Sequence, residues 1–282
     1  MQKTAGQAAR LSVSIVLYNS PISRFERTLN TLQRAAERVQ EDIALQPVVV
    51  RVVDNASEST YRAELSQLMA NWPKDGFLQV EFLPLDANIG FGAGHNAALD
   101  GIDSDYHLVL NPDVELDEDA LAVGLTRLAS DSSIALLSPR VTGSSGQPEY
   151  LCKRYPSVLV LLLRGFAPRF VRRWFRSRLD SYEMRDVCIG DAEAEVDIAS
   201  GCFMLLRTDT LRAVHGFDEG FLLYFEDFDL CLRLRTHGRL LFYPDMRIVH
   251  HGGEAARKGL RHISWFVGSA LRFFRLHGWK VL

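Results

Sequence analysis

Residues 48–55 read Val48-Val-Val-Arg-Val-Val-Asp54-Asn55, a β-branched apolar run that ends in two polar side chains. Comparable apolar runs occur at 11–17, 78–83 and 107–110, and helical periodicity separates them at about 22–39, 58–70, 92–101 and 117–129. Nearly continuous hydrophobic strands that alternate with helices are typical of a parallel sheet covered on both faces. The pattern therefore predicts an α/β fold with a mostly parallel central sheet between two layers of helices.

The length and composition fit one folded domain. The 282 residues are 47% hydrophobic and show no internal repeat or low-complexity linker. We therefore expect a single domain over residues 1–282, with a nucleotide-binding half at about 11–138 and an acceptor half at about 139–282. The four cysteines form no CxxC pair, which favours a reducing cytoplasm over a zinc ribbon or a disulfide scaffold. The N-terminus lacks the features of a signal peptide, and the longest apolar run, 158–163, is too short to span a bilayer.

Polar residues follow each predicted strand at the end where this type of sheet binds ligands. They are Tyr18 and Asn19, Asp54 and Asn55, Asn88, and Asn111 and Asp113. Asp54 could accept a hydrogen bond from the imino group of a nucleotide base, and Asn19 and Asn55 could orient the base or the ribose. Each of these residues could equally cap the helix that follows it. Because four strand ends share this character, we expect a binding site at this edge of the sheet.

Three glycines, Gly90, Gly92 and Gly94, follow the third predicted strand and precede Asn96. Glycines let a backbone approach a ligand closely, and the N-terminus of the following helix could face a phosphate. A dinucleotide-binding oxidoreductase would instead carry GxGxxG after the first strand, where this chain has Tyr18-Asn-Ser-Pro-Ile-Ser. The sequence therefore argues against that class of enzyme.

The tripeptide Asn111-Pro112-Asp113 ends the fourth predicted strand, where the diphosphate of a nucleotide would lie. Asp113 offers the oxygen ligands that Mg²⁺ and Mn²⁺ prefer, and substrate phosphates usually complete the shell of these metals. His250 or His251 could add an imidazole, which suits Mn²⁺ better than Mg²⁺. We therefore expect a divalent metal, Mg²⁺ or Mn²⁺, at Asp113, although Pro-Asp turns without a metal are also common.

The densest acidic and aromatic stretch runs from Gly216 to Arg233 and contains Glu226, Asp227 and Asp229. Acidic residues in the first turn of a helix complement its dipole, which would explain any one of the three. Three acids in four residues, flanked by aromatic side chains that can stack on a sugar, exceed that need. We select Asp227 and Glu226 as candidate catalytic residues, with Asp227 taking the proton of an attacking hydroxyl group.

Taken in order, these motifs resemble those of the family 2 glycosyltransferases of the GT-A fold and, within them, the bacterial rhamnosyltransferase-like group. The matching segments are 16–19, 52–57, 88–96, 110–114, 200–201, 216–219, 224–231 and 250–253. The resemblance implies a Rossmann-like GT-A sandwich and an inverting single displacement with a nucleotide-sugar donor. It also implies that Asp54 holds the base and that Asp227 is the catalytic base. Asp113 would be the remaining metal aspartate of a DxD-type motif, since Asn111 replaces the first aspartate.

The resemblance extends to a full set of candidate site residues. The nucleotide-sugar contacts would be Tyr18, Asn19, Asp54, Asn55, Asn88, Gly90, Phe91, Gly92, Asn96, Asn111 and Asp113. The acceptor or sugar contacts would be Ser200, Gly201 and Tyr224, and the metal ligands would be Asp113 and His250.

For the donor, the resemblance suggests dTDP-L-rhamnose, with UDP-sugars as the nearest competitors. The acceptor would be a growing bacterial surface glycan, such as O-antigen on a lipid carrier. A non-catalytic nucleotide-sugar-binding scaffold of polysaccharide assembly and a retaining transferase stay open as alternatives. A sugar nucleotidyltransferase is less favoured, because it should carry a glycine-rich loop near the N-terminus, whereas residues 11–23 contain no glycine.

Residues 151–179 contain eight lysines and arginines and no acidic residue, interleaved with apolar and aromatic side chains. This mixture is typical of an interfacial helix, which anionic lipid would favour by roughly 1 kcal/mol per surface-near cation. A helix packed on the main domain with a solvated basic face would have the same composition. We expect peripheral association with the anionic inner face of the cell membrane. Nucleic acid is a poorer partner, since no recognised binding module accompanies the segment.

Overall fold

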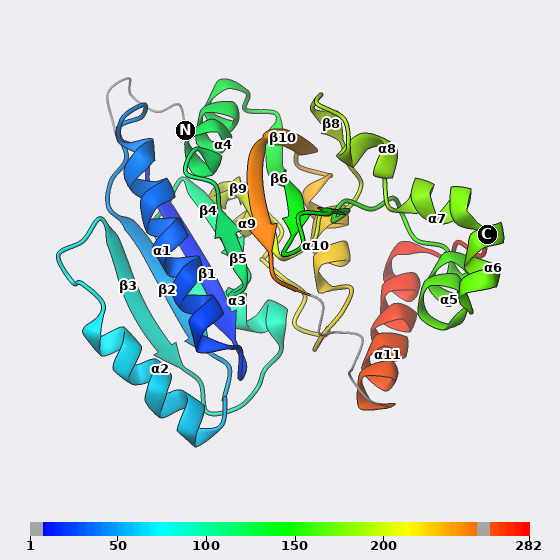
Figure 1. Cartoon of the computed structure of the whole chain (residues 1–282), viewed down its shortest axis with the longest axis horizontal. Coiled ribbons are helices and arrows are strands. Elements are labelled where there is room, and N and C mark those ends of the chain that lie inside the picture. The colour runs from blue at the N-terminus through cyan, green and yellow to red at the C-terminus, as the bar shows by residue number, and fades with distance from the viewer. Residues whose placement is uncertain (1–7, 253–259) are drawn as a thin grey trace.

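The computed structural model describes residues 8–252 and 260–282 and shows a central sheet with helices packed against it (Figure 1). The spatial order of the strands is β3-β2-β1-β4-β9-β6-β10-β5, with β7 paired to β6 and β8 paired to β10. The strands are β1 Leu11–Leu17, β2 Val48–Asp54, β3 Leu78–Pro84, β4 Tyr106–Leu110, β5 Val114–Leu116, β6 Ile134–Gly143, β7 Pro148–Glu149, β8 Ala194–Glu195, β9 Phe203–Arg207 and β10 Arg239–His250. One sheet thus runs through both predicted halves of the chain.

The helices cover both faces of this sheet. They are α1 Ile22–Val39, α2 Ser59–Asn71, α3 Phe91–Leu99, α4 Ala120–Ser130, α5 Val158–Phe166, α6 Arg169–Trp174, α7 Arg176–Tyr182, α8 Arg185–Cys188, α9 Thr208–Ala213, α10 Glu226–Leu234 and α11 Leu260–His277. Along β9, Phe203 and Leu205 join the apolar cluster that includes α1 and α4, whereas Met204 and Leu206 join the cluster that includes α10. This alternation is what a strand buried on both faces requires. The predicted α/β architecture is confirmed.

Strand directions explain why the site lies at one edge. β3, β2, β1 and β4 are mutually parallel, so their carboxyl ends lie together. β9 runs antiparallel to both β4 and β6, and β5 runs antiparallel to β10. The β5–β10 pairing sets His250 opposite Val114, beside Asp113, although 137 positions separate the histidine from that aspartate. The sheet is therefore mixed in its second half.

The amino-terminal elements agree with the sequence prediction more closely than the later ones. The apolar run 196–206 also predicts a strand, but β9 begins only at Phe203, because a turn that starts at Ser200 precedes it. A second run, 247–250, predicts a short strand, which is the end of the much longer β10. Helix α11 was not predicted from the sequence.

The basic segment 151–179 does not form one continuous helix. It folds into α5, α6 and part of α7, because Ala167 adopts an extended conformation before Pro168 and ends α5. These short helices lie beside α11 at one end of the molecule (Figure 1), and Leu161 of α5 shares an apolar cluster with Phe273 and Phe274 of α11. Within the described ranges, no helix has both the length and the apolar character needed to cross a bilayer.

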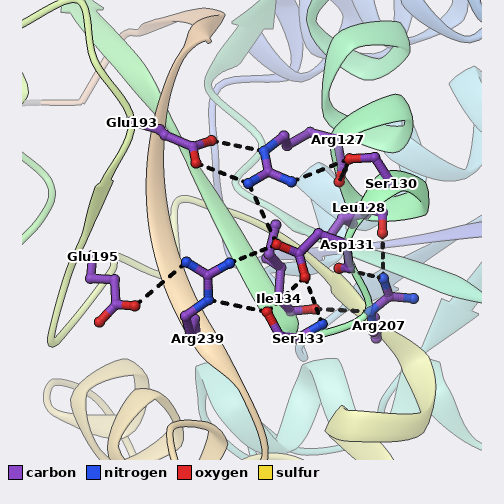
Figure 2. Close-up of polar contacts among 10 residues, drawn as sticks. All are labelled: Arg127, Leu128, Ser130, Asp131, Ser133, Ile134, Glu193, Glu195, Arg207 and Arg239. Carbon is purple, nitrogen blue, oxygen red and sulfur yellow. Dashed lines mark hydrogen bonds and ion pairs between the residues drawn. The ribbon is translucent and has the colours of Figure 1, made fainter.

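A polar network fixes the opposite end of the sheet (Figure 2). The guanidinium of Arg207, at the end of β9, donates to the carbonyl oxygens of Leu128, Asp131 and Ile134. It thereby serves carbonyl groups at the C-terminus of α4 that have no partner inside the helix. The carboxylate of Asp131 also accepts from Arg239 of β10 at 2.6 Å. The network ties a helix to three strands far from the predicted site.

We predict that Arg207→Met lowers the free energy of unfolding by about 1–3 kcal/mol, because it removes the hydrogen bonds of a charged donor to three carbonyl groups. Urea unfolding would measure the change, with Arg34→Met, which removes an exposed arginine of α1, as the matched control. The control should change stability by less than about 0.5 kcal/mol. Equal midpoints for Arg207→Met and the wild type would contradict the stabilising role of this network.

Candidate active site

Two cavities adjoin the carboxyl edge of the sheet. The larger, here called the Asp113 cavity, encloses about 700 Å³ and is lined by residues of several strand ends together with Leu222, Leu223, His262 and Trp265. The predicted residues that line it are Tyr18, Asn55, Asn88, Gly90, Phe91, Asn111 and Asp113. The smaller, here called the Asp227 cavity, encloses about 460 Å³ and includes the predicted residues Ser200, Tyr224, Glu226 and Asp227. Both volumes lie within the range of about 300–1,000 Å³ that is usual for small-molecule sites.

Asn55 folds the loop that forms one wall of the Asp113 cavity. Its side-chain amide donates to the carbonyl of Gly90 at 3.0 Å and to the side-chain oxygen of Asn88 at 3.1 Å. Its own side-chain oxygen accepts from the backbone of Ile89 at 2.9 Å. Gly90 has φ +98°, and a β-carbon there would lie 2.6 Å from the carbonyl oxygen of Leu222. The loop therefore requires glycine at this position for both conformation and space.

Asn19 and Asp54 were expected at the nucleotide, but neither lines the cavity. Asn19 accepts from the backbone of Glu58 at 2.9 Å and so connects two neighbouring loops. Asp54 is fully buried, and its two oxygens accept from the backbone of Ser57 at 3.1 Å and from Arg62 at 2.6 Å. In this structure both side chains order the wall behind the cavity. A contact between Asp54 and a base stays a prediction.

Gly92 and Asn96 also lie outside the lining of the Asp113 cavity. A β-carbon at Gly92 would come within 2.8 Å of the Phe217 side chain, so glycine allows α3 to pack against that residue. The Asn96 amide exchanges two 2.9 Å hydrogen bonds with the backbone of Phe217. These residues fix the 216–219 turn against α3. A contact between either residue and the ligand stays a prediction.

Asp113 and His250, the two residues expected to bind a metal, lie side by side. Among the described residues, the buried Asp113 Oδ1 atom has no hydrogen-bond partner, and it lies 3.6 Å from His250 Nε2. His250 Nδ1 donates to Glu149 of β7 at 2.8 Å, which leaves Nε2 as the nitrogen that faces Asp113. A carboxylate that orients a histidine in this way is typical of metal sites. The donor set therefore fits a divalent cation.

The protein alone would not complete the coordination shell. Across residues 8–252 and 260–282, no three His, Cys, Asp or Glu side chains are grouped closely enough to hold a metal by themselves. Mg²⁺ and Mn²⁺ sites of this kind take their remaining ligands from water and substrate phosphates. Gly253, which belongs to the matched segment 250–253, lies outside the described residues.

Asp227 is held at the start of α10 by two backbone amides. Its Oδ2 atom accepts from Gly201 at 3.1 Å and its Oδ1 atom from Phe228 at 2.9 Å. The two residues before the helix, Tyr224 and Phe225, have φ values of +71° and +66°. Left-handed backbone at bulky residues costs of order 1–3 kcal/mol each and often marks functional sites. The strained turn directs the first turn of α10 toward the cavity.

Burial raises the pKa values of two neighbouring carboxyl groups in this cavity. Burial, and then the negative charge of Asp227, raise the pKa of Glu226 to about 8, so Glu226 is mainly protonated at pH 7. Burial also raises the pKa of Asp227, but the amides of Gly201 and Phe228 stabilise its ionised form. Neighbouring carboxyl groups in unlike environments can divide acid and base roles. Because its carboxylate accepts these two amide hydrogen bonds, Asp227 is the member suited to accept a proton.

Gly201 lines neither cavity but lies between a wall residue of each. A β-carbon at this position would lie 2.9 Å from the Phe91 ring, which lines the Asp113 cavity, and 3.5 Å from the β-carbon of Asp227. Tyr224 and His262 make a second connection, since their side chains are 3.1 Å apart and line different cavities. The walls of the two cavities are therefore in contact.

Glu149 and the buried position of Lys153 were not predicted from the sequence. Glu149 carries no motif, and only the pairing of β7 with β6 brings it to His250. Lys153 was noted only as part of the basic segment, but it is buried in the Asp227 cavity. Burial, and then the neighbouring charge of Arg164, lower the pKa of Lys153 to about 8. Its unusual burial could be found only from the fold.

Comparisons with known proteins support a glycosyltransferase. The sequence profile of Glycosyl transferase family 2 matches residues 12–208. The chain is 27% identical over 197 residues to "Rhamnosyltransferase WbbL" of Escherichia coli K12, covering 65% of this chain and 69% of that protein. It is also 27% identical over 254 residues to "N-acetylglucosaminyl-diphospho-decaprenol L-rhamnosyltransferase" of Mycobacterium tuberculosis, covering 86% of this chain and 76% of the relative.

Solved structures share the fold at lower sequence identity. A mannosyltransferase of Pyrobaculum calidifontis, in complex with GDP-Man and Mn²⁺, matches with a TM-score of 0.60 and 18% identity over 95% of this chain and 65% of its own. The structure of GalNAc-T7 with UDP, GalNAc and Mn²⁺ matches with a TM-score of 0.61 and 15% identity over 87% of this chain. This chain spans only 43% of the GalNAc-T7 chain.

We predict that Glu226→Gln stabilises the protein at pH 7. With a folded-state pKa of about 8 and an ordinary value of 4.5, Glu226 must take up a proton on folding between these pH values. Stability is therefore full below about pH 4.5 and falls as pH rises towards 8. Glutamine avoids this loss, so the variant should gain on the order of 3 kcal/mol at pH 7 and less than about 1 kcal/mol at pH 5.

Urea unfolding at pH 5 and pH 7 would measure both differences. Glu58→Gln, at an exposed glutamate before α2, is the matched control and should show no comparable dependence on pH. A Glu226→Gln variant that is less stable than the wild type at pH 7 would show that Glu226 is ionised in the folded protein.

Proposed function

The chain belongs to Glycosyl transferase family 2, and on that basis we propose that it transfers a sugar from a nucleotide donor to a glycan hydroxyl with inversion. The expected GT-A type of fold agrees with the solved glycosyltransferases that it matches. The observation that carries the proposal is the contact of two cavity walls beside Gly201, one wall with Asp113 and the other with Asp227. We treat the two halves, about 11–138 and 139–282, as one catalytic unit.

On the donor side, the Asp113 cavity would hold the nucleotide sugar. Tyr18, Asn55 and Asn88 offer aromatic and amide groups for the base and ribose at the ends of the parallel strands. Asp113 and His250 would hold the divalent metal, with Glu149 keeping the imidazole in position. A metal bound there would neutralise negative charge on the departing diphosphate. The protein need not supply the whole coordination shell, since the diphosphate itself would supply oxygen ligands.

On the acceptor side, Asp227 would accept the proton of the attacking hydroxyl group. The amides of Gly201 and Phe228 hold its carboxylate in place, so its orientation does not depend on the substrate. Glu226 Oε2 is buried and has no hydrogen-bond partner among the described residues, and its protonated carboxyl group could donate to an acceptor oxygen. An acceptor approaching from the Asp227 cavity would attack the face of the sugar opposite the nucleotide. That arrangement would invert the configuration.

The donor that we propose is dTDP-L-rhamnose. Two relatives with 27% identity are named as rhamnosyltransferases. A UDP-sugar is the second candidate, because TarS of S. aureus, a structural neighbour with 17% identity and a TM-score of 0.56, was solved with UDP-GlcNAc. Both donors present a pyrimidine base and a diphosphate, so the same strand ends could serve either.

The acceptor that we propose is a lipid-linked glycan, made at the cytoplasmic face of a membrane. One relative is named for an acceptor of this kind, N-acetylglucosaminyl-diphospho-decaprenol. Phe166, Phe170 and Trp174 of α5 and α6 are 56%, 65% and 82% exposed, and arginines lie between them in the sequence. Exposed aromatic and cationic side chains suit an anionic membrane surface. The helices would place the Asp227 cavity near the lipid.

We predict that Asp227→Asn lowers turnover by about 10²–10⁴-fold, because the amide cannot accept the proton of the hydroxyl group. Nucleoside diphosphate affinity should stay unchanged, since Asp227 lines the other cavity. Turnover would be measured as nucleotide release with dTDP-rhamnose and a lipid-linked acceptor, and Asp209→Asn, on the exposed side of α9, is the control. Full turnover in Asp227→Asn would remove this residue from the mechanism.

Donor binding without transfer by the wild type would favour the non-catalytic scaffold.

We predict that Asp113→Ala removes the metal-dependent part of nucleotide affinity. Calorimetry with dTDP, UDP and GDP would compare Mn²⁺, Mg²⁺ and EDTA, and the wild type should bind dTDP most tightly with a metal present. Asp113→Ala should bind dTDP equally weakly with Mn²⁺ and with EDTA, whereas the exposed neighbour Glu118→Ala should behave as the wild type. A gain with Mn²⁺ that persists in Asp113→Ala would exclude Asp113 as a metal ligand.

A further inference from the structure

We propose that the outer wall of the Asp227 cavity binds a diphosphate group of the acceptor through Arg164, Arg172 and Lys153. The inference rests on the proposed function, because it assigns the Asp227 cavity to the acceptor. It adds a recognition site for the diphosphate that would join the sugar of such an acceptor to its apolar chain. Neither the carboxylates of α10 nor the metal-ligand pair takes part in it.

Three cations line this cavity together with the catalytic carboxylates. Lys153 is only 8% exposed, and its ammonium group lies 6.0 Å from the centre of the Tyr182 ring. The guanidinium of Arg164 lies 5.5 Å from the same ring. Arg172 of α6 completes the group from the exposed side. The helices α5 and α6 and the segment before α5 thus each contribute one cation to the lining of the same cavity.

The charges in the cavity do not balance without an anion. Glu183 pairs with Arg164 at 3.3 Å, but it is also engaged by Arg185 at 2.6 Å. Glu226 is mainly protonated at pH 7, so Asp227 and the shared Glu183 are the other acids of the lining, against the three cations. A buried ammonium group beside other cations is unfavourable unless an opposite charge pairs with it. A dianionic ligand would supply that charge.

Guanidinium groups favour phosphate over other anions. Their planar arrangement of donors matches two phosphate oxygens at once, and arginine keeps its charge when a ligand excludes water. Lys153 would add a point charge deeper in the cavity. A sugar ring that presents its hydroxyl group to Asp227 would leave its reducing end, and the diphosphate attached there, towards α5 and α6.

The surroundings of the arginines fit an apolar chain. Leu162 and Phe166 are one turn apart on α5, and both are more than half exposed. Phe170 on α6 is 65% exposed. Leu161 and Phe266 add apolar surface to the cavity itself. A chain leaving the diphosphate would therefore meet apolar side chains before it reached a bilayer.

Anionic lipid headgroups could also attract these helices, so the test must separate the two sources of phosphate. The probe is farnesyl diphosphate, which joins a diphosphate to a short apolar chain without a sugar, with farnesol as the uncharged counterpart. Calorimetry in EDTA would limit binding at the donor site, and Asp113→Ala checks that the Asp113 cavity is not involved. Vesicles that contain anionic phospholipid, sedimented with the same proteins, form the second arm.

The variants are Arg164→Gln, Arg172→Gln and the double substitution, and the matched control is Arg173→Gln, which does not line the cavity. We expect the double variant to bind farnesyl diphosphate at least tenfold more weakly than the wild type. Arg172→Gln alone should weaken binding by threefold or more, and this exposed position is the safer one for folding. Arg173→Gln and Asp113→Ala should stay within twofold of the wild type. Farnesol should bind all of these proteins equally.

Several results would overturn the proposal. Wild-type affinity in the double variant would exclude the two arginines, and an equal loss in Arg173→Gln would show general attraction to a basic surface. A loss of vesicle binding without a loss of farnesyl diphosphate binding would assign these arginines to lipid headgroups. Nucleotide calorimetry on the same samples tests the proposed function separately. Failure there with farnesyl diphosphate binding intact would reject the transferase and keep the diphosphate site.

Discussion

The close contact of Gly201 with Phe91 on one side and Asp227 on the other is the constraint on which the site depends. Its amide donates to the Asp227 carboxylate, and the absence of a side chain lets the Phe91 ring approach. A larger residue would separate the two cavities or displace the carboxylate. The turn at Ser200 and Gly201 also ends just before β9, the strand that joins the two halves of the sheet. The same short turn therefore leads into the strand that connects the two halves of the sheet and holds the Asp227 carboxylate.

Much of the donor side could be predicted from the sequence, because it follows from the geometry of parallel strands. Apolar runs in the sequence identify β1 to β4, and the carboxyl ends of parallel strands must converge on one edge. Asn55, Asn88 and Asp113 accordingly line one cavity, as expected. The family assignment from the ordered motifs was also correct. The apolar runs and the order of the motifs along the chain were sufficient to predict these strands, these cavity residues and the family.

The rest depends on contacts between distant segments, which no local pattern contains. Asp54 was expected to bind a base, and even its pairing with Arg62, eight residues later, was not predicted from the sequence. Asn96 likewise pairs with the backbone of Phe217, 121 positions away. Glu149 and Lys153 come to their cavities through strand pairing and helix packing, and neither lies in a motif. The acceptor side was for this reason the less predictable half.

The central claim is that nucleotide and acceptor occupy different cavities on either side of Gly201. A crystal structure of the protein grown with dTDP and Mn²⁺ would test it most directly, since anomalous scattering identifies the metal. The account predicts the nucleotide in the Asp113 cavity, with the metal at Asp113 and His250. A nucleotide bound in the Asp227 cavity, or a metal held by other residues, would contradict the account.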